Sequence, residues 1–358
     1  MRFIKLDGLR GIFSLMIVLY HYLQEFLPIY FYRFFIIRES YAFVDFFFVL
    51  SGFVISHNYN QIGSREQFFT YVKKRFIRLY PLLFYTVMIY FLFRLLALNL
   101  FPDVIDSSVS FDAMLIKTLD ALLFTNSTVI LGGENGGMNS PSWSISAEMI
   151  TYILFGLVVG LTGEKKIVKS VIFGLVIGFA SIILIYEGSL FKMSDYGYLR
   201  SFISFLMGYF VWKLNPKKIK IKKNLELLFP LIIILMLYFL HNYKNTDLKF
   251  YFEFLVPPVF AMFIYFLLVS KGLLTSMLES KPIQYLGKIS YSIYLNHFLI
   301  LMILPKASFI LLKLENSNAN QLLILIFTMI LIIIYSHVTH QIIELRGGRF
   351  LKRILLKS

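Results

Sequence analysis

The first apolar segment carries polar residues at spacings that place them on one face of a helix. Arg10 and His21 are eleven positions apart, within about 20° of a whole number of turns. Asp7 and Ser14 share that face at seven-residue spacing. Eleven residues rise about 16 Å, roughly half of a hydrocarbon core about 30 Å thick. His21 is therefore expected near mid-membrane, where an imidazole could take up a proton or a transferred group; the other interpretation is a histidine hydrogen-bonded for packing.

A basic stretch precedes the third apolar segment. Arg75 and Arg78 are an i,i+3 pair, so both project to one side of a helix. Two guanidinium groups on one face suit bidentate phosphate binding, which lysine matches less well. The alternative is simple membrane topology, because positive residues collect at the cytoplasmic ends of spanning helices.

Polar residues also interrupt the second apolar segment. Asp45 lies near its expected outer end and needs a polar partner. Ser51 and Gly52 lie at mid-segment, where small residues allow another helix to approach closely.

Two further motifs bring polar groups to the starts or interiors of later spans. The sequence Trp143-Ser144-Ile145-Ser146-Ala147-Glu148 leads into the fourth apolar segment. Glu148 could satisfy the amides of a helix N-terminus or orient a histidine, and both interpretations stay open. His297, which ends Tyr291-Ser292-Ile293-Tyr294-Leu295-Asn296-His297, lies inside a later span.

The last span carries three polar side chains on one face: His337, His340 and Glu344. A metal would need further ligands that the sequence does not supply convincingly, so no metal site is expected.

The composition indicates the element that must position these groups. Of 358 residues, 58% are hydrophobic and only 15% are charged, whereas soluble domains carry about 25% charged residues. A spanning helix needs roughly 20 apolar residues, and backbone groups in lipid must be paired within a helix or a closed barrel. We expect an all-α polytopic bundle of about ten transmembrane helices, at 11–28, 42–57, 81–98, 149–163, 167–186, 198–212, 225–241, 251–270, 289–311 and 321–343.

Charge asymmetry predicts the orientation of these helices. With the N-terminus in the cytoplasm, 25 Lys and Arg residues fall in inner segments and 8 in outer ones. The positive-inside rule then places both termini in the cytoplasm. The same topology explains the net charge of +15 without a nucleic-acid partner. The absence of cysteine excludes disulfides, thiol nucleophiles and thiolate metal sites.

The connection at about 99–148 is expected outside, with a surface helix at 113–124. The apolar runs leave no stretch for a separate soluble domain, so residues 1–358 are expected to form a single membrane domain.

Five motifs in this order resemble the acyltransferase-3 family of integral-membrane acyltransferases, and the resemblance extends from residue 6 to about 344. They are Leu6-Asp7-Gly8-Leu9-Arg10-Gly11 with His21, Phe46-Phe47-Phe48-Val49-Leu50-Ser51-Gly52-Phe53, Arg75-x-x-Arg78, Trp143-Ser144-Ile145-Ser146-x-Glu148 and Tyr291-Ser292-Ile293-Tyr294-Leu295-x-His297. Arg10 with His21 is similar to the family's Arg-x10-His motif. The family often has Glu-x-Pro in the last span, but Leu345-Arg346 follows Glu344 here, and no role is expected for Glu344.

The resemblance implies transfer of an acyl group, usually acetyl, from cytoplasmic acyl-coenzyme A to a hydroxyl of a surface polysaccharide or its lipid-linked precursor. His21 would be catalytic with support from Glu148, and Arg10, Arg75 and Arg78 would bind the donor. Supporting or pocket positions would be Asp7, Asp45, Ser51, Trp143, Ser144, Ser146 and His297. Acyl-coenzyme A would be a substrate, with no permanently bound cofactor, and the protein would reside in the inner (cytoplasmic) membrane. The alternative is a transporter or flippase for a lipid-linked glycan, since buried His and Arg also serve proton relays.

Overall fold

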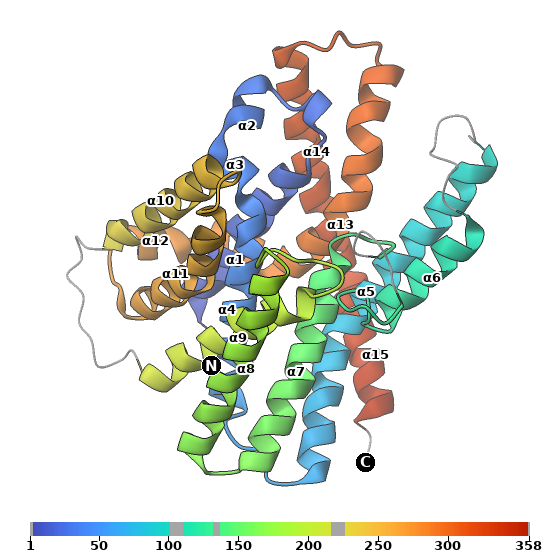
Figure 1. Cartoon of the computed structure of the whole chain (residues 1–358). Helices are drawn as coiled ribbons and strands as arrows, with labels where there is room; N and C mark the ends of the chain where they lie inside the picture. The colour runs from blue at the N-terminus through green and yellow to red at the C-terminus, as the bar shows by residue number, and fades with distance from the viewer. Residues whose placement is uncertain (1–2, 101–109, 132–136, 216–225, 357–358) are drawn as a thin grey trace. The chain divides into compact units, whose positions relative to one another are not determined.

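Every apolar segment expected to span the membrane overlaps a helix. The computed structural model describes residues 3–100, 110–131, 137–215 and 226–356, and within these ranges the chain forms helices and no strand (Figure 1). In chain order, the helices at the expected spans are α1 (Ile4–His21), α4 (Phe43–Asn58), α5 (Arg65–Leu100), α7 (Ser142–Thr162), α8 (Lys166–Tyr186), α9 (Gly197–Leu214), α10 (Leu228–Tyr243), α11 (Lys249–Val269), α13 (Lys281–Leu311) and α14 (Asn318–Thr339).

Seven of the described helices are long and apolar enough to cross a membrane: α4, α5, α7, α8, α11, α13 and the segment that begins with α14. Helix α10 is apolar but shorter. The all-helical membrane fold is thereby confirmed, while ten crossings and two cytoplasmic termini stay predictions. Five of the lysines counted as cytoplasmic, between 217 and 223, lie outside the described residues.

Shorter helices lie between the long ones or, for the last, follow them. They are α2 (Ile29–Arg33), α3 (Phe35–Arg38), α6 (Phe111–Leu122), α12 (Leu273–Leu278) and α15 (Arg346–Leu355). The predicted surface helix at 113–124 corresponds to α6. A π-helical turn, η6 (His340–Leu345), joins α14 to α15.

Helix α1 differs from its expected range of 11–28. It begins seven residues earlier, at Ile4, and ends at His21, because Tyr22 takes an extended conformation with φ −62° and ψ 135°. A 3-10 turn follows at Gln24–Phe26, and it ends before Leu27 because Pro28 disfavours helical backbone at the residue before it. His21 is therefore the last residue of its helix rather than a residue within it.

The chain divides into two compact units, and each is described by itself. Unit 1 comprises residues 1–60, 175–191 and 202–336, and unit 2 comprises 61–174, 192–201 and 337–358.

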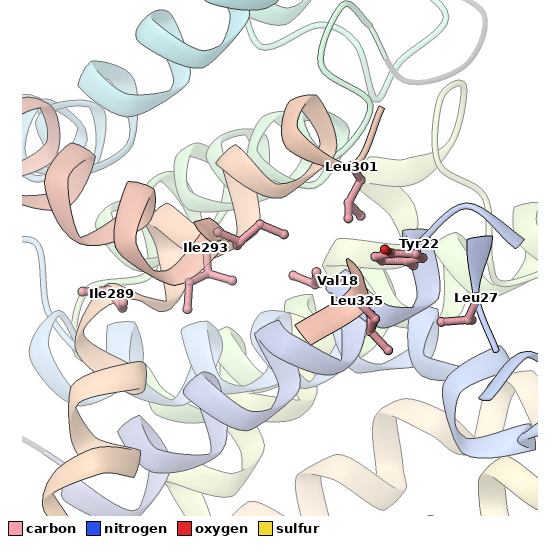
Figure 2. Close-up of a cluster of buried hydrophobic side chains, with 8 residues drawn as sticks. Val18, Tyr22, Leu27, Ile289, Ile293, Leu301 and Leu325 are labelled. Carbon is pink, nitrogen blue, oxygen red and sulfur yellow. The ribbon is translucent and has the colours of Figure 1, made fainter. Parts of the chain in front are cut away.

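In unit 1, α1 packs along α13 with their backbones in direct contact. A Cβ on Gly11 would lie 2.6 Å from the backbone nitrogen of Gly287, and a Cβ on Gly287 would collide with the carbonyl of Asp7. Apolar side chains fill the interface beyond this crossing, among them Val18, Ile289 and Ile293 (Figure 2). Lipid offers no hydrophobic driving force for helix association, so close packing of this kind must hold the pair together.

A second glycine-mediated crossing in unit 1 joins α4 to α9. A Cβ on Gly52 would collide with the carbonyl of Phe205, and one on Gly208 with the carbonyl of Val49. The close helix approach predicted at Ser51-Gly52 is confirmed, and its partner is α9.

In unit 2, the 36-residue helix α5 is the common neighbour of α6, α7, η6 and α15. Figure 1 shows the red helix α15 beside the light-blue α5. Gly347 lets α15 approach Pro81 of α5, because a Cβ there would lie 2.9 Å from the proline ring. This packing places Glu344 of η6 against Arg78 of α5.

Candidate active site

The predicted catalytic histidine pairs with a second histidine in unit 1. His297 Nε2 lies 3.3 Å from His21 Nδ1, and the ring centroids are 5.1 Å apart. His21 Nδ1 is also 3.0 Å from the carbonyl oxygen of Ile17. His297 is fully buried, whereas His21 is half-buried. The structure thus brings together two candidates that are 276 residues apart in the chain.

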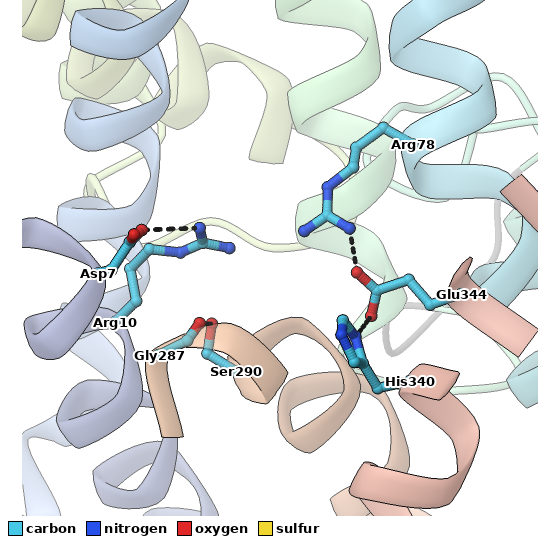
Figure 3. A network of polar contacts seen from close by, with 7 residues as sticks. All are labelled: Asp7, Arg10, Arg78, Gly287, Ser290, His340 and Glu344. Atoms are coloured by element: carbon cyan, nitrogen blue, oxygen red, sulfur yellow. Dashed lines mark hydrogen bonds and ion pairs between the residues drawn. The ribbon is translucent and has the colours of Figure 1, made fainter. Parts of the chain in front are cut away.

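The other residues predicted on the His21 face lie nearer the start of α1. Arg10 and Asp7 form an ion pair with 3.7 Å between Nη1 and Oδ1 (Figure 3). Both side chains keep some exposure, 28% for Arg10 and 21% for Asp7. Ser14 is buried and donates to the carbonyl of Gly11 in its own helix. The Arg10 side chain therefore keeps exposed surface, while the Ser14 hydroxyl is bonded within its own helix.

Asp45 is fully buried and has the polar partner that the sequence required. Ser204 Oγ of α9 donates to Asp45 Oδ1 at 2.7 Å. Ser51, on the same helix as Asp45, is half-buried. This pair ties α4 to α9 beside the glycine crossing, so its evident role is to fix those two helices.

In unit 2, Arg78 forms an ion pair that the sequence analysis did not anticipate. Arg78 Nη1 contacts Glu344 Oε1, and His340 Nδ1 donates to Glu344 Oε2 at 2.9 Å (Figure 3). The Glu344 side chain is 2% exposed, whereas that of Arg78 is 42% exposed. The buried carboxylate thus holds one nitrogen of a guanidinium group that keeps exposed surface.

The expectation that Glu344 has no role was therefore wrong in structural terms. Leu345-Arg346 replaces the family's x-Pro after Glu344 but leaves the carboxylate itself in place. His340 and Glu344 at i,i+4 in an apolar span were the available signal, because buried ionisable residues need partners. Both lie on a π-helical turn, a rare conformation that is frequent at functional sites.

Arg75 and Glu148 are connected through one tyrosine. The Arg75 guanidinium lies over the Tyr152 ring, 5.9 Å from its centroid, and Tyr152 OH donates to Glu148 Oε1 at 2.5 Å. Since α7 begins at Ser142, Glu148 lies beyond the first turn and does not cap the helix N-terminus. The first interpretation of Glu148 is thus wrong, and its orientation of a histidine stays a prediction.

The serines and tryptophan that precede Glu148 are buried and hold the start of α7. Ser142 accepts a hydrogen bond from Asn126 Nδ2 at 2.8 Å, and Ser146 donates to Asn126 Oδ1. Ser144 donates to the carbonyl of Pro141 at 3.0 Å. These contacts indicate that Ser144 and Ser146 position α7.

Trp143 covers a buried arginine that the sequence analysis did not select. The Arg200 guanidinium lies 5.3 Å from the centroid of the Trp143 ring, and Arg200 is 2% exposed. A Cβ on Gly197 would lie 2.9 Å from that ring, so the absence of a side chain lets the tryptophan pack closely against the start of α9.

Comparison with known proteins decides the family. A family model described as an acyltransferase domain, that of acyltransferase-3, matches residues 3–338. The chain belongs to the acyltransferase-3 family. Protein 2 in the picA locus of Rhizobium radiobacter is 34% identical to this acyltransferase-3 protein over 165 residues, which are 43% of this chain and 81% of the relative. No solved structure matches this chain significantly.

The family match covers most, but not all, of the residues described above; His340 and Glu344 lie beyond its end. The match begins before Asp7 and extends past His297, so it includes α1, the α5 arginines and α13. The predicted family is confirmed, and the chain is a multi-pass membrane protein of the transferase class.

Proposed function

We propose that this protein transfers an acetyl group from cytoplasmic acetyl-coenzyme A to a hydroxyl of a surface polysaccharide or its lipid-linked precursor. The observation that carries the proposal is the half-buried His21, paired with His297, in a chain matched from residue 3 to 338 by an acyltransferase domain. Family membership supports acyl transfer, and the His21 pair offers a base for activating a hydroxyl.

The reaction requires movement of one proton and one acyl group. In direct transfer, His21 removes the proton of the acceptor hydroxyl as its oxygen attacks the thioester carbonyl carbon. The carbon–sulfur bond then breaks, and the coenzyme A thiolate takes the proton from His21. In the covalent route the imidazole nitrogen attacks the thioester carbonyl carbon, the carbon–sulfur bond breaks and coenzyme A leaves as the thiolate. The acceptor oxygen then takes the acyl group from the nitrogen, and the hydroxyl proton passes to the thiolate. Both routes give an ester and free coenzyme A, and both use the same nitrogen of His21.

Arginines suit the donor, whose phosphates are anionic. We assign donor binding to Arg10, Arg75 and Arg78. Arg10 and Arg78 each hold a carboxylate yet keep exposed surface, 28% and 42% of their side chains. An arginine oriented in this way loses less conformational entropy on binding phosphate than a free one. Acyl-coenzyme A acts as a co-substrate, with no resident cofactor.

The cytoplasmic donor and the basic inner segments favour residence in the cytoplasmic membrane, with the bilayer itself as a partner. A hydroxyl acceptor on a glycan or lipid-linked glycan suits a protein embedded where such precursors are assembled.

The decisive experiment uses purified protein in nanodiscs, acetyl-coenzyme A labelled in the acetyl group, and a panel of glycans and lipid-linked glycans. We expect label to appear on a glycan hydroxyl with wild-type protein and not with His21→Ala. In proteoliposomes, movement of an unlabelled lipid-linked glycan across the bilayer, with no label transfer to any acceptor, would favour the transporter alternative.

A further inference from the structure

The pairing of His21 with His297 depends on how α1 and α13 lie against each other. The helices touch at Gly11 and Gly287, where added side chains would collide with backbone atoms of the partner. His21 is ten residues after Gly11, and His297 is ten residues after Gly287. The second contact thus lies the same number of residues toward the C-terminus on both helices, so α1 and α13 run side by side in the same direction.

This equal spacing gives the two histidines the same height along the pair. Ten helical residues rise about 15 Å on either helix. Val18, Ile289 and Ile293 fill the intervening interface as part of one buried cluster (Figure 2). The glycine crossing and the apolar packing together set the distance of 3.3 Å between His21 Nδ1 and His297 Nε2.

The hydrogen-bond partners assign a tautomer to each ring. A carbonyl oxygen only accepts, so the contact of 3.3 Å between His297 Nδ1 and the carbonyl of Ile293 requires a proton on His297 Nδ1. His297 Nε2 of the neutral ring is then an acceptor. His21 Nδ1, 3.0 Å from the carbonyl of Ile17, must likewise carry a proton, and it shares that proton with His297 Nε2.

The consequence is that Nε2 of His21 carries the lone pair. A general base or an acyl acceptor needs that lone pair on the nitrogen that meets the substrate. When His21 Nε2 gains a proton, the Nδ1–H···Nε2 bond to His297 becomes charge-assisted and therefore stronger. In the serine-protease triad an aspartate stabilises the protonated histidine in the same way. In the apolar surroundings of α13, a neutral imidazole avoids the cost of a buried carboxylate.

We propose that His297 is a positioning residue that holds His21 in its Nδ1–H tautomer and stabilises the charged form that arises during transfer. This inference rests on the proposed function for its catalytic consequence, although the tautomer itself does not. His297 does not touch the reacting atoms; it acts on them through His21.

The experiment compares two substitutions at one position. His297→Leu removes the hydrogen-bond acceptor Nε2 and introduces an apolar side chain in its place. His297→Gln places an amide oxygen near the position of Nε2. We expect kcat to fall about 10- to 100-fold in His297→Leu, as for residues that orient a catalytic ligand, with unchanged donor KM and partial recovery in His297→Gln. His57→Leu, a histidine that packs on Phe53 at the end of α4, serves as the matched control and should leave kcat unchanged.

A spectroscopic readout separates this proposal from the proposed function. The chain has six histidines, so nitrogen-15 NMR of histidine-labelled protein in nanodiscs can be assigned with single-site variants. We expect wild-type His21 to be protonated at Nδ1 alone, and His297→Leu to raise the Nε2–H population. An Nε2–H tautomer in the wild type, or normal kcat in folded His297→Leu, would overturn the proposal. Absence of acyl transfer in a protein with the expected tautomer would instead contradict the proposed function.

Discussion

At the scale of single residues, the chemistry depends on side chains held by partners far away in the chain. His21 and His297 are separated by 276 positions, and Arg78 and Glu344 by 266. The sequence could nominate His21, Arg78 and His297, because ionisable groups in apolar spans need a reason to persist. It could not pair them, because which faces of two helices meet is a property of tertiary packing.

The first residue-scale prediction concerns His21. We expect His21→Ala to reduce transfer by a factor of about 10²–10⁴, the range for loss of a general base, or by more if the imidazole accepts the acyl group. Expression and donor binding should stay normal, because α1 is held by its glycine crossing and apolar face. Turnover from labelled acetyl-coenzyme A measures the effect, with His57→Ala as the control. Near-normal turnover in the folded variant would refute the catalytic role.

The donor arginines give a second prediction. Loss of a charge-assisted contact costs about 1.5–3 kcal/mol, so Arg75→Ala and Arg78→Ala should each weaken donor binding roughly tenfold to a hundredfold, with less effect on the acceptor. Isothermal titration calorimetry with a non-hydrolysable acetyl-coenzyme A analogue measures the donor affinity of each variant.

Arg78→Ala also leaves the buried Glu344 carboxylate without its arginine partner, and such a loss can cost about 3–5 kcal/mol in stability. Arg78→Lys avoids this problem because it keeps a positive charge for Glu344 and loses only the planar fork. Unchanged donor affinity in folded Arg75→Ala and Arg78→Lys would mean that these arginines do not bind the donor.

At the scale of helices, the sequence predicts where elements lie better than how they cross. Each expected span overlaps a helix, because apolar periodicity and length are local properties. The end of α1 at His21 was missed, since the extended conformation of Tyr22 interrupts a run that is still apolar. Gly52 was recognised as a contact point, whereas its partner Gly208, 156 positions away, became evident only in the folded chain.

The glycine crossing of α1 and α13 gives an element-scale prediction. In Gly11→Ala, the new Cβ would lie 2.6 Å from the backbone of Gly287, so the helices must separate and the histidine pair must widen. We expect a loss of about 1–3 kcal/mol, typical of overpacking, together with reduced turnover. Thermal unfolding in detergent and the labelled assay measure the two effects.

Gly178→Ala is the matched control, because nothing lies within 4 Å of a Cβ at that helical position. It should be neutral or up to about 1 kcal/mol more stable, since alanine favours helix over glycine. Equal behaviour of the two variants would mean that close contact at Gly11 does not hold the histidine pair.

At the scale of the whole molecule, the number of crossings decides where the termini lie. Ten crossings place both termini on one side of the membrane. If only the seven helices that meet the length and hydropathy requirement cross, the termini lie on opposite sides. Helices α1, α9 and α10 make the difference.

We predict ten crossings, with the N-terminus, residue 218 and the C-terminus all in the cytoplasm and residue 130 outside. With a cytoplasmic C-terminus, seven crossings would leave the N-terminus and the segment 213–223 outside. That segment holds six lysines, Lys213, Lys217, Lys218, Lys220, Lys222 and Lys223, and an excess of lysine is strongly disfavoured on the outer side. Reporter fusions at 130, 218 and 358, with an N-terminal tag tested for protease access, measure the orientation. Because positions 130 and 358 lie on the same sides in both topologies, they act as internal controls, and an external residue 218 would refute ten crossings.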